Sequence, residues 1–132
     1  MTKKDGCPTG EKKIHGECWK QIGVIGVDSG QILIVDPAYL DTEWKKEDFP
    51  ENAKNGKLPK SKNKMSYYAC CRKTLLSLSE GQLTYENGLP GLGVVSCTGF
   101  GDGEYPVYAQ ITDYGKLGKR VSKLLIDFIS EK

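Results

Sequence analysis

The sequence holds few of the residues on which enzyme centres are usually built. It has one histidine, His15, among 132 residues. No nucleophile or acid stands at a motif spacing from it, so a catalytic triad would have to be assembled across the fold. An exposed, non-catalytic histidine is the favoured interpretation. The sequence thus leans away from an enzyme without excluding one.

Long apolar runs are also missing. No stretch of 18 apolar residues occurs, so no membrane-spanning helix is expected. The first residues, Met1 to Gly6, lack the apolar region of a secretory signal. These observations predict a cytoplasmic protein with no membrane partner.

Neither sign of charge is in clear excess, because 19 basic and 17 acidic residues give a net charge of +2. That balance is too small to indicate a nucleic-acid-binding protein. Five acids lie in residues 41–51, and five lysines follow in 52–64. The lysines are Lys54, Lys57, Lys60, Lys62 and Lys64. They lack the interleaved aromatics that stack on bases, so a solvated loop is favoured. A weak nucleic-acid contact, with Lys119, Arg120 and Lys123, is the alternative.

The cysteines are five, an odd number for a secreted disulfide framework. Cys7 and Cys18 could close a small hairpin, or could offer zinc a site together with His15. Zinc ligands usually come in closer pairs, so reduced thiols are favoured and no metal or cofactor is expected. Cys71 stands beside Arg72 and Lys73, which would lower a thiol pKa, but a packed cysteine is the preferred interpretation.

The length suits one domain with a single core. Residues 1–21 are polar and predict a flexible segment with a small hairpin. Residues 22–132 predict one β-rich domain that carries a long charged loop at 41–64. The β-branched runs 22–27 and 31–35 predict two strands paired across the turn Asp28–Gly30, the second ended by Pro37.

Further elements are predicted along the rest of the chain. Residues 42–48 form a short helix anchored by Trp44, or else part of the loop. Residues 65–70 are extended and lead into a helix at 72–78. One alternative is a helix through Tyr68, Cys71, Leu75 and Leu78 with Gly81 as its C-cap. The other is a strand at 65–70 followed by a turn. Strands follow at 82–87, 93–98 and 105–111. Residues 121–129 fit a helix or a strand, and a strand is favoured. The fold class expected is mainly β (α+β), an antiparallel β-sandwich or partly open barrel with one or two short helices.

The stretch "GFGDGEYPVY", residues 99–108, concentrates glycines and acids. It lacks the following helix of a dinucleotide fingerprint, the periodic acids of a calcium loop and the serine of a nucleophile elbow. Glycine and aspartate favour turns. The stretch therefore predicts a tight hairpin corner between strands 93–98 and 105–111, and in second place a ligand-facing one.

Two separated motifs resemble an uncharacterised bacterial and phage family, a domain of unknown function. The first motif is S-G-x-I-x-I-x-D-P, matched by Ser29, Gly30, Asp36 and Pro37. The second is G-x-G-D-G-x-Y-P-V, matched by Gly99, Gly101, Asp102, Gly103, Tyr105, Pro106 and Val107. The resemblance covers residues 24–40 and 91–129. It implies a β-rich domain and a strand at the end of the chain, and it brings no established activity.

The favoured function is a small non-enzymatic binding or interaction module, such as a ligand sponge, an inhibitor or an immunity-type protein. Its partner would be a small molecule or a protein, and a homodimer is left open. The ligand-binding residues expected are Asp36, Tyr39, Gly101, Asp102, Gly103 and Tyr105. One alternative is a small hydrolase in which Asp36 and Asp102 act as a carboxylate pair. The other is the nucleic-acid contact through the lysine tract.

Overall fold

The computed structural model describes residues 6–53 and 57–129. These residues form two compact units, one from Met1–Val27 with Asp102–Lys132 and the other from Asp28–Gly101. Each unit contains one antiparallel sheet, and neither sheet closes on itself. Two short helices complete the regular structure of the described chain, together with a 3₁₀ turn. The prediction of a mainly β, α+β fold is therefore confirmed.

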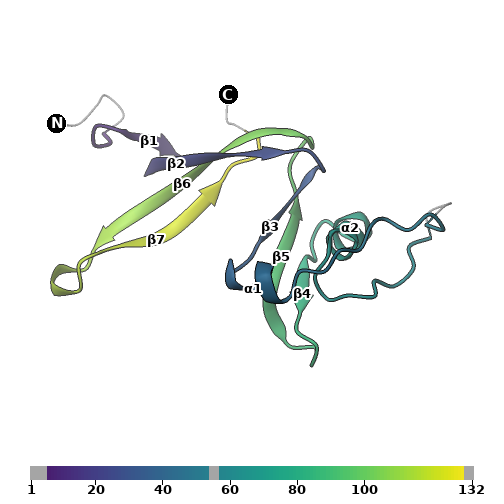
Figure 1. Ribbon diagram of the computed structural model, residues 1–132. Helices are drawn as coiled ribbons and strands as arrows, with labels where there is room; N and C mark the ends of the chain where they lie inside the picture. Colours follow the sequence, from purple (N-terminus) through teal and green to yellow (C-terminus); the bar gives the residue numbers. More distant parts are fainter. Residues whose placement is uncertain (1–5, 54–56, 130–132) are drawn as a thin grey trace. The chain divides into compact units, whose positions relative to one another are not determined.

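The first unit is a four-stranded sheet in the order β1-β2-β6-β7 (Figure 1). Its strands are β1 (Glu11–Ile14), β2 (Glu17–Val27), β6 (Gly103–Asp113) and β7 (Lys119–Ile126). β1 and β2 form a hairpin, and β6 and β7 form a longer one that turns through η1 (Gly115–Leu117). Ile14, Trp19 and Tyr108 pack together with Leu125 against them. A strand was favoured for residues 121–129; it is confirmed for 121–126, since β7 ends at Ile126.

A disulfide joins Cys7 to Cys18 in this unit. It ties the segment before β1 to the start of β2, and so closes a short loop around the β1–β2 hairpin. The preference for reduced thiols is wrong for this pair, because the hairpin brings the two Cα atoms to 5.6 Å, within disulfide range. The other three cysteines, Cys70, Cys71 and Cys97, are free thiols.

The second unit is a three-stranded sheet with helix α2 (Tyr67–Leu76) packed against it (Figure 1). The strand order is β3-β5-β4, with β3 (Gln31–Ile34), β4 (Gln82–Thr84) and β5 (Pro90–Cys97). Met65, Cys70 and Leu83, together with Leu92 and Val95, form the buried cluster of this unit. A five-residue helix, α1 (Ala38–Thr42), follows β3.

The pairing of strands differs from the prediction in a systematic way. Strand β2 pairs with β6, and β3 pairs with β5, so the runs 22–27 and 31–35 do not pair with each other. The strands predicted at 93–98 and 105–111 likewise do not form a hairpin, since β5 and β6 belong to different sheets. Of the two neighbouring strands β2 and β3, one enters each sheet, and the same is true of β5 and β6. Long-range pairing has replaced the pairing of neighbours that short turns usually favour.

The helices also lie at other positions than expected. α1 comes before the helix predicted at 42–48, because Asp36 and Pro37 start it early. α2 begins at Tyr67 instead of Arg72, so the extended start predicted for 65–70 is wrong. Its start is set by Ser66, whose extended backbone and side-chain oxygen cap the helix by accepting the Ala69 N–H at 3.0 Å. Gly81 does not end α2, whose C-cap is Ser77.

The longest described helix, α2, has ten residues. Among the described residues, no helix combines the length and the apolar character that crossing a bilayer requires.

We expect thiol titration of the unfolded, unreduced chain to find three reactive groups, and five after reduction, because Cys7 and Cys18 are bonded. The double substitution of Cys7 and Cys18 by serine should lower the free energy of unfolding by about 3 kcal/mol, the loop entropy of a short disulfide ring. Five reactive thiols before reduction would contradict this pairing.

Gly81 supports the sheet of the second unit through its lack of a side chain. A Cβ there would lie 1.9 Å from the carbonyl oxygen of Val95, while the Gly81 carbonyl accepts the Val95 N–H at 2.8 Å. Gly81→Ala should therefore lower the unfolding free energy by about 2–3 kcal/mol in chemical denaturation. Gly26→Ala, where a Cβ meets open space, is the control. Equal effects of both substitutions would refute the explanation.

Candidate functional site

The predicted ligand residues of the second unit are engaged in local structure. Asp36 follows β3, and its Oδ1 accepts the Ala38 N–H at 3.0 Å, which starts α1. The Tyr39 hydroxyl is hydrogen-bonded to the Tyr85 hydroxyl at 3.0 Å, and the two rings meet edge to face. That hydrogen bond is the main reason why the pKa of Tyr39 lies above its ordinary value. Both residues thus have structural roles, and a ligand role for them stays a prediction.

The glycine–aspartate stretch is a turn between two sheets rather than a hairpin corner. The Gly101 N–H bonds the Thr98 carbonyl at 2.8 Å, and the Thr98 hydroxyl bonds the Gly101 carbonyl at 2.7 Å. Gly101 has a φ of +107°, which a residue with a side chain rarely adopts. The exposed Asp102 follows, and Gly103 begins β6 opposite Val27.

Tyr105 is buried in the first unit, where its ring packs edge to face on Phe128 at 5.4 Å. Asp36 belongs to the second unit and Asp102 to the first. The carboxylate pair of the hydrolase alternative, like the ligand roles of Gly101, Asp102, Gly103 and Tyr105, stays a prediction.

The other predicted reactive groups are also held in structural contacts. Cys71 is buried, as predicted, and its Sγ accepts a hydrogen bond from the Gln31 amide at 3.3 Å. Burial raises the pKa of the adjacent Cys70 thiol to about 11, which keeps it protonated at neutral pH. His15 is exposed at the β1–β2 turn, with Nε2 3.4 Å from Asp127 Oδ2.

A cavity of about 290 Å³ in the second unit gathers positive charge. Its cationic lining residues are Lys60, Lys62, Lys64, Arg72 and Lys73. Among the described residues that line it, Glu86 is the one carboxylate, and the remaining lining residues are neutral. Three of these lysines belong to the tract that was interpreted as a solvated loop, whereas Arg72 and Lys73 come from α2. The fold thus adds two cations that the tract alone lacks, and we call this cavity the basic cavity.

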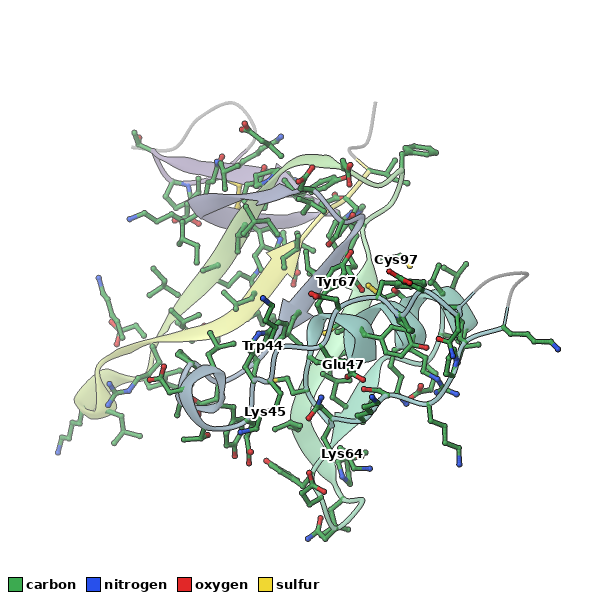
Figure 2. The ribbon with its side chains drawn as sticks, turned by 45° about the vertical axis from the view of Figure 1, so that its right-hand side comes forward. Trp44, Lys45, Glu47, Lys64, Tyr67 and Cys97 are labelled. Carbon is green, nitrogen blue, oxygen red and sulfur yellow. A yellow bond between two sulfur atoms is a disulfide. The ribbon has the colours of Figure 1, made fainter. Side chains whose placement is uncertain are left out.

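The carboxylate of Glu47 accepts hydrogen bonds from residues 57–64, which we call the lysine segment. Figure 2 labels Glu47 and, from this segment, Lys64. Glu47 Oε1 accepts hydrogen bonds from the Ser61 hydroxyl at 2.6 Å and the Ser66 hydroxyl at 2.7 Å. Its Oε2 accepts the Lys62 N–H at 2.8 Å, and the Asn63 amide donates to Oε1 at 3.3 Å. Ser66 is also the N-cap of α2. One side chain therefore fixes the segment and the helix start that together carry the basic cavity.

The ionisation of Glu47 reflects this environment. Burial by itself raises the pKa of the carboxyl group, but four hydrogen bonds outweigh it and lower the pKa to about 2. Ser61 contributes most, followed by the Lys62 N–H, Ser66 and Asn63. Glu47 is therefore a charged anchor at every physiological pH. It does not line the basic cavity; it lines the neighbouring cavity, which shares Lys60 and Lys62 with it.

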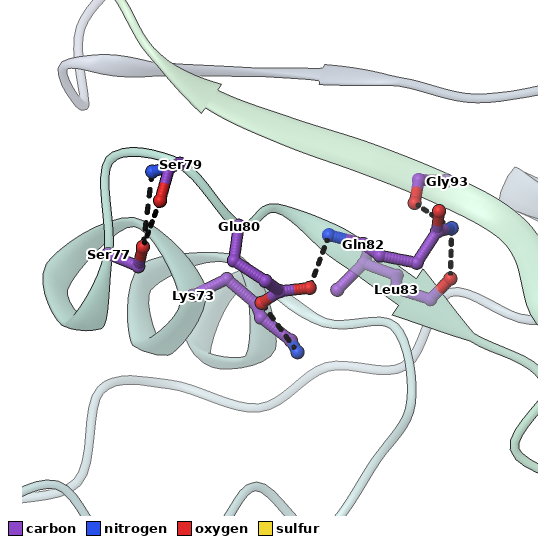
Figure 3. A network of polar contacts seen from close by, with 7 residues as sticks. All are labelled: Lys73, Ser77, Ser79, Glu80, Gln82, Leu83 and Gly93. Carbon is purple, nitrogen blue, oxygen red and sulfur yellow. Dashed lines mark hydrogen bonds and ion pairs between the residues drawn. The ribbon is translucent and has the colours of Figure 1, made fainter.

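Two contacts from α2 set the other wall. The Arg72 Nε–H donates to the Pro59 carbonyl at 3.2 Å, which leaves the terminal nitrogens of the guanidinium available to a ligand. Lys73 Nζ lies 3.1 Å from Glu80 Oε2, whose Oε1 accepts the Gln82 N–H at 3.1 Å (Figure 3). The hydrogen bond from Lys73 lowers the pKa of Glu80. Lys73 is thus partly neutralised, whereas no ion pair holds the other cations of the cavity among the described residues.

The chemistry available here is the recognition of negative charge. Ammonium and guanidinium groups donate hydrogen bonds to phosphate and carboxylate oxygens. A metal site is not indicated, since the described residues include no group of three His, Cys, Asp or Glu side chains that could hold an ion. The clustering of Lys57, Lys60, Lys62 and Lys64 in one polar segment was the sequence signal for this cavity.

Comparisons with known proteins add nothing to the site. No family model matches the chain, and neither a curated protein nor a solved structure matches it. The candidate site therefore rests on the geometry described above.

The contribution of Glu47 should depend on pH in a defined way. Its pKa is lowered in the folded chain, so its stabilisation is complete above about 4.5 and is lost as the pH falls towards about 2. Glu47→Gln should lower the unfolding free energy at pH 7 by about 2 kcal/mol, since hydrogen bonds to a charged acceptor are replaced. It should also flatten the loss of stability between pH 4.5 and 2.

Chemical denaturation at several pH values measures both effects. Glu51→Gln removes the same charge from an exposed residue and serves as the control. A Glu47→Gln chain that loses stability with acid as steeply as the unsubstituted chain would show that this carboxylate is not the anchor.

Proposed function

We propose that this protein is a binding module whose basic cavity takes a small ligand with clustered negative charge, of which phosphate groups are the most suitable. The carrying observation is the convergence of five cationic side chains on one cavity of about 290 Å³ that has a single carboxylate on its wall. The proposal keeps the expected non-enzymatic binding module and gives it a different site and a ligand class.

The balance of charge supports an anionic ligand. Lys60, Lys62 and Lys64 are exposed, so their ammonium groups are hydrated and mutually repelling until a counter-charge enters. Glu86 and the Lys73–Glu80 pair offset only part of the positive charge. A polyanion bound among these groups gains several interactions at once.

Binding is favoured over catalysis by the composition of the wall. Among its described lining residues there is no histidine or cysteine, and Glu86 is the only acidic group. Lysine and arginine near phosphate supply positioning and charge, which are the requirements of a binding site. The segment that carries the lysines is fixed by Glu47, so part of the site is organised before a ligand arrives.

The compartment is part of the proposal. A cytoplasmic location was expected, but structural disulfides such as Cys7–Cys18 are typical of oxidising compartments. We infer that the chain works where this hairpin is oxidised. Two of its free thiols, Cys70 and Cys71, are protected there by burial, and Cys97 is partly buried.

The proposal predicts that the chain binds inorganic tripolyphosphate in isothermal titration calorimetry. The double substitution Lys62→Gln and Lys64→Gln should weaken binding at least tenfold, which corresponds to about 1.4 kcal/mol. Raising the salt concentration should weaken binding too, because the contacts are exposed ion pairs.

The control is the double substitution Lys12→Gln and Lys13→Gln, which removes the same charge from β1 in the other unit. Equal losses in the two double variants would mean that overall charge attracts the anion and that the cavity does not. Absence of binding by the unsubstituted chain in low salt would overturn the proposal.

A further inference from the structure

A second cavity, of about 510 Å³, adjoins the basic cavity. Lys60 and Lys62 line both cavities, so the two meet along this part of the lysine segment. The second cavity differs sharply in chemistry. Its walls include two aromatic rings, Phe49 and Tyr68, and two prolines, Pro50 and Pro59. We call it the aromatic cavity.

A hydrogen bond of Tyr68 and a ring contact with Phe49 fix the aromatic wall. The buried Tyr68 donates its hydroxyl hydrogen to the Pro59 carbonyl, so its ring is fixed between α2 and the lysine segment. Phe49 stands at 88° to that ring, with centroids 5.3 Å apart. Phe49 is still 40% exposed. It therefore offers ring surface to a ligand without first having to be ordered.

The polar groups of the aromatic cavity suit a heterocycle rather than a phosphate. Three carboxylates line its wall: Glu47, which is held by its hydrogen bonds, and the exposed Asp48 and Glu51. Carboxylates repel anions but accept hydrogen bonds from N–H and O–H groups. Asn52 adds an amide that can both donate and accept. Positive charge is confined to the side shared with the basic cavity, where Lys60 and Lys62 stand. The two cavities thus suit a ligand with an anionic end for the basic cavity and an uncharged, hydrogen-bond-donating end for the aromatic cavity.

We propose that the ligand is a nucleoside phosphate, with its phosphates in the basic cavity and its base against Phe49 in the aromatic cavity. This inference rests on the proposed function and extends it. Bases stack on aromatic side chains whatever their sequence, and their exocyclic amino groups donate to carboxylates. A ribose placed between the two cavities lies beside Lys60 and Lys62. The ligand is either a free nucleotide or one unit of a single strand, since both present this chemistry.

The test compares three probes in calorimetric titrations at fixed salt: ATP, tripolyphosphate and a single-stranded ten-nucleotide oligomer. Phe49→Leu removes the ring and keeps an apolar side chain. We expect it to weaken ATP binding roughly tenfold, the usual effect of losing one stacked base, and to leave tripolyphosphate binding unchanged. Phe100→Leu, at a ring that is 91% exposed elsewhere in the same unit, should change neither. Thermal unfolding of each variant verifies that it is folded.

The outcomes separate this inference from the function on which it rests. If tripolyphosphate binds as tightly as ATP and Phe49→Leu alters neither, the basic cavity stands and the nucleoside is excluded. If no probe binds, both proposals fall. Tighter binding of the oligomer than of ATP, sensitive to Phe49→Leu, identifies a single strand as the source of the nucleotide, and the reverse order identifies a free nucleotide.

Should Phe49→Leu unfold the chain, Asp48→Asn together with Glu51→Gln provides a second probe of the same cavity. Neutralising these carboxylates should enhance tripolyphosphate binding through reduced repulsion. It should not enhance ATP binding to the same extent, because amide oxygens accept weaker hydrogen bonds from the base than carboxylates do. An equal gain for both ligands would overturn the placement of the base.

Discussion

The carboxylate of Glu47 is the constraint on which the second unit depends. Residues 57–64 have no helix or strand, and their lysines repel one another, so this segment has little reason to hold one conformation. The Glu47 carboxylate accepts hydrogen bonds from four donors, and these replace the hydrogen bonds that a helix or strand would supply. Because Ser66 both donates to Glu47 and caps α2, the anchor joins the loop to the helix. The negative charge of Glu47 also offsets part of the repulsion among the lysines of this segment, to which it is hydrogen-bonded.

The strands were the most predictable part of the fold. The run 22–27, rich in β-branched residues, became part of β2. The segment 121–126 was compatible with both periods, and the turn before it favoured the strand that β7 forms. The pairings were not predictable in the same way. A short turn such as Asp28–Gly30 is compatible with a hairpin and also with a strand that moves to another sheet, and only long-range partners decide between them.

The start of α2 was mispredicted because its first turn, Tyr67 to Cys70, is rich in residues that are poor helix formers. The deciding signal was the N-cap Ser66. It is a weak signal in the sequence, because Ala69 occupies the position at which a full capping box has glutamate. The candidate site was harder still. No periodicity marks an irregular segment, and nothing in the residues around Glu47 announces that they fold back onto Ser61 and Ser66. The tertiary fold alone brings Arg72 and Lys73 to the lysines.

The order of the strands along the chain has a consequence for biosynthesis. Asp28–Gly101 is one uninterrupted segment, inserted between the two halves of the other unit. On a ribosome, β2 emerges early but its partner β6 is made only after that whole insert. The sheet begun first is therefore finished last, and until then β2 has only β1 to pair with. The Cys7–Cys18 disulfide can hold the β1–β2 hairpin together until β6 has been synthesised.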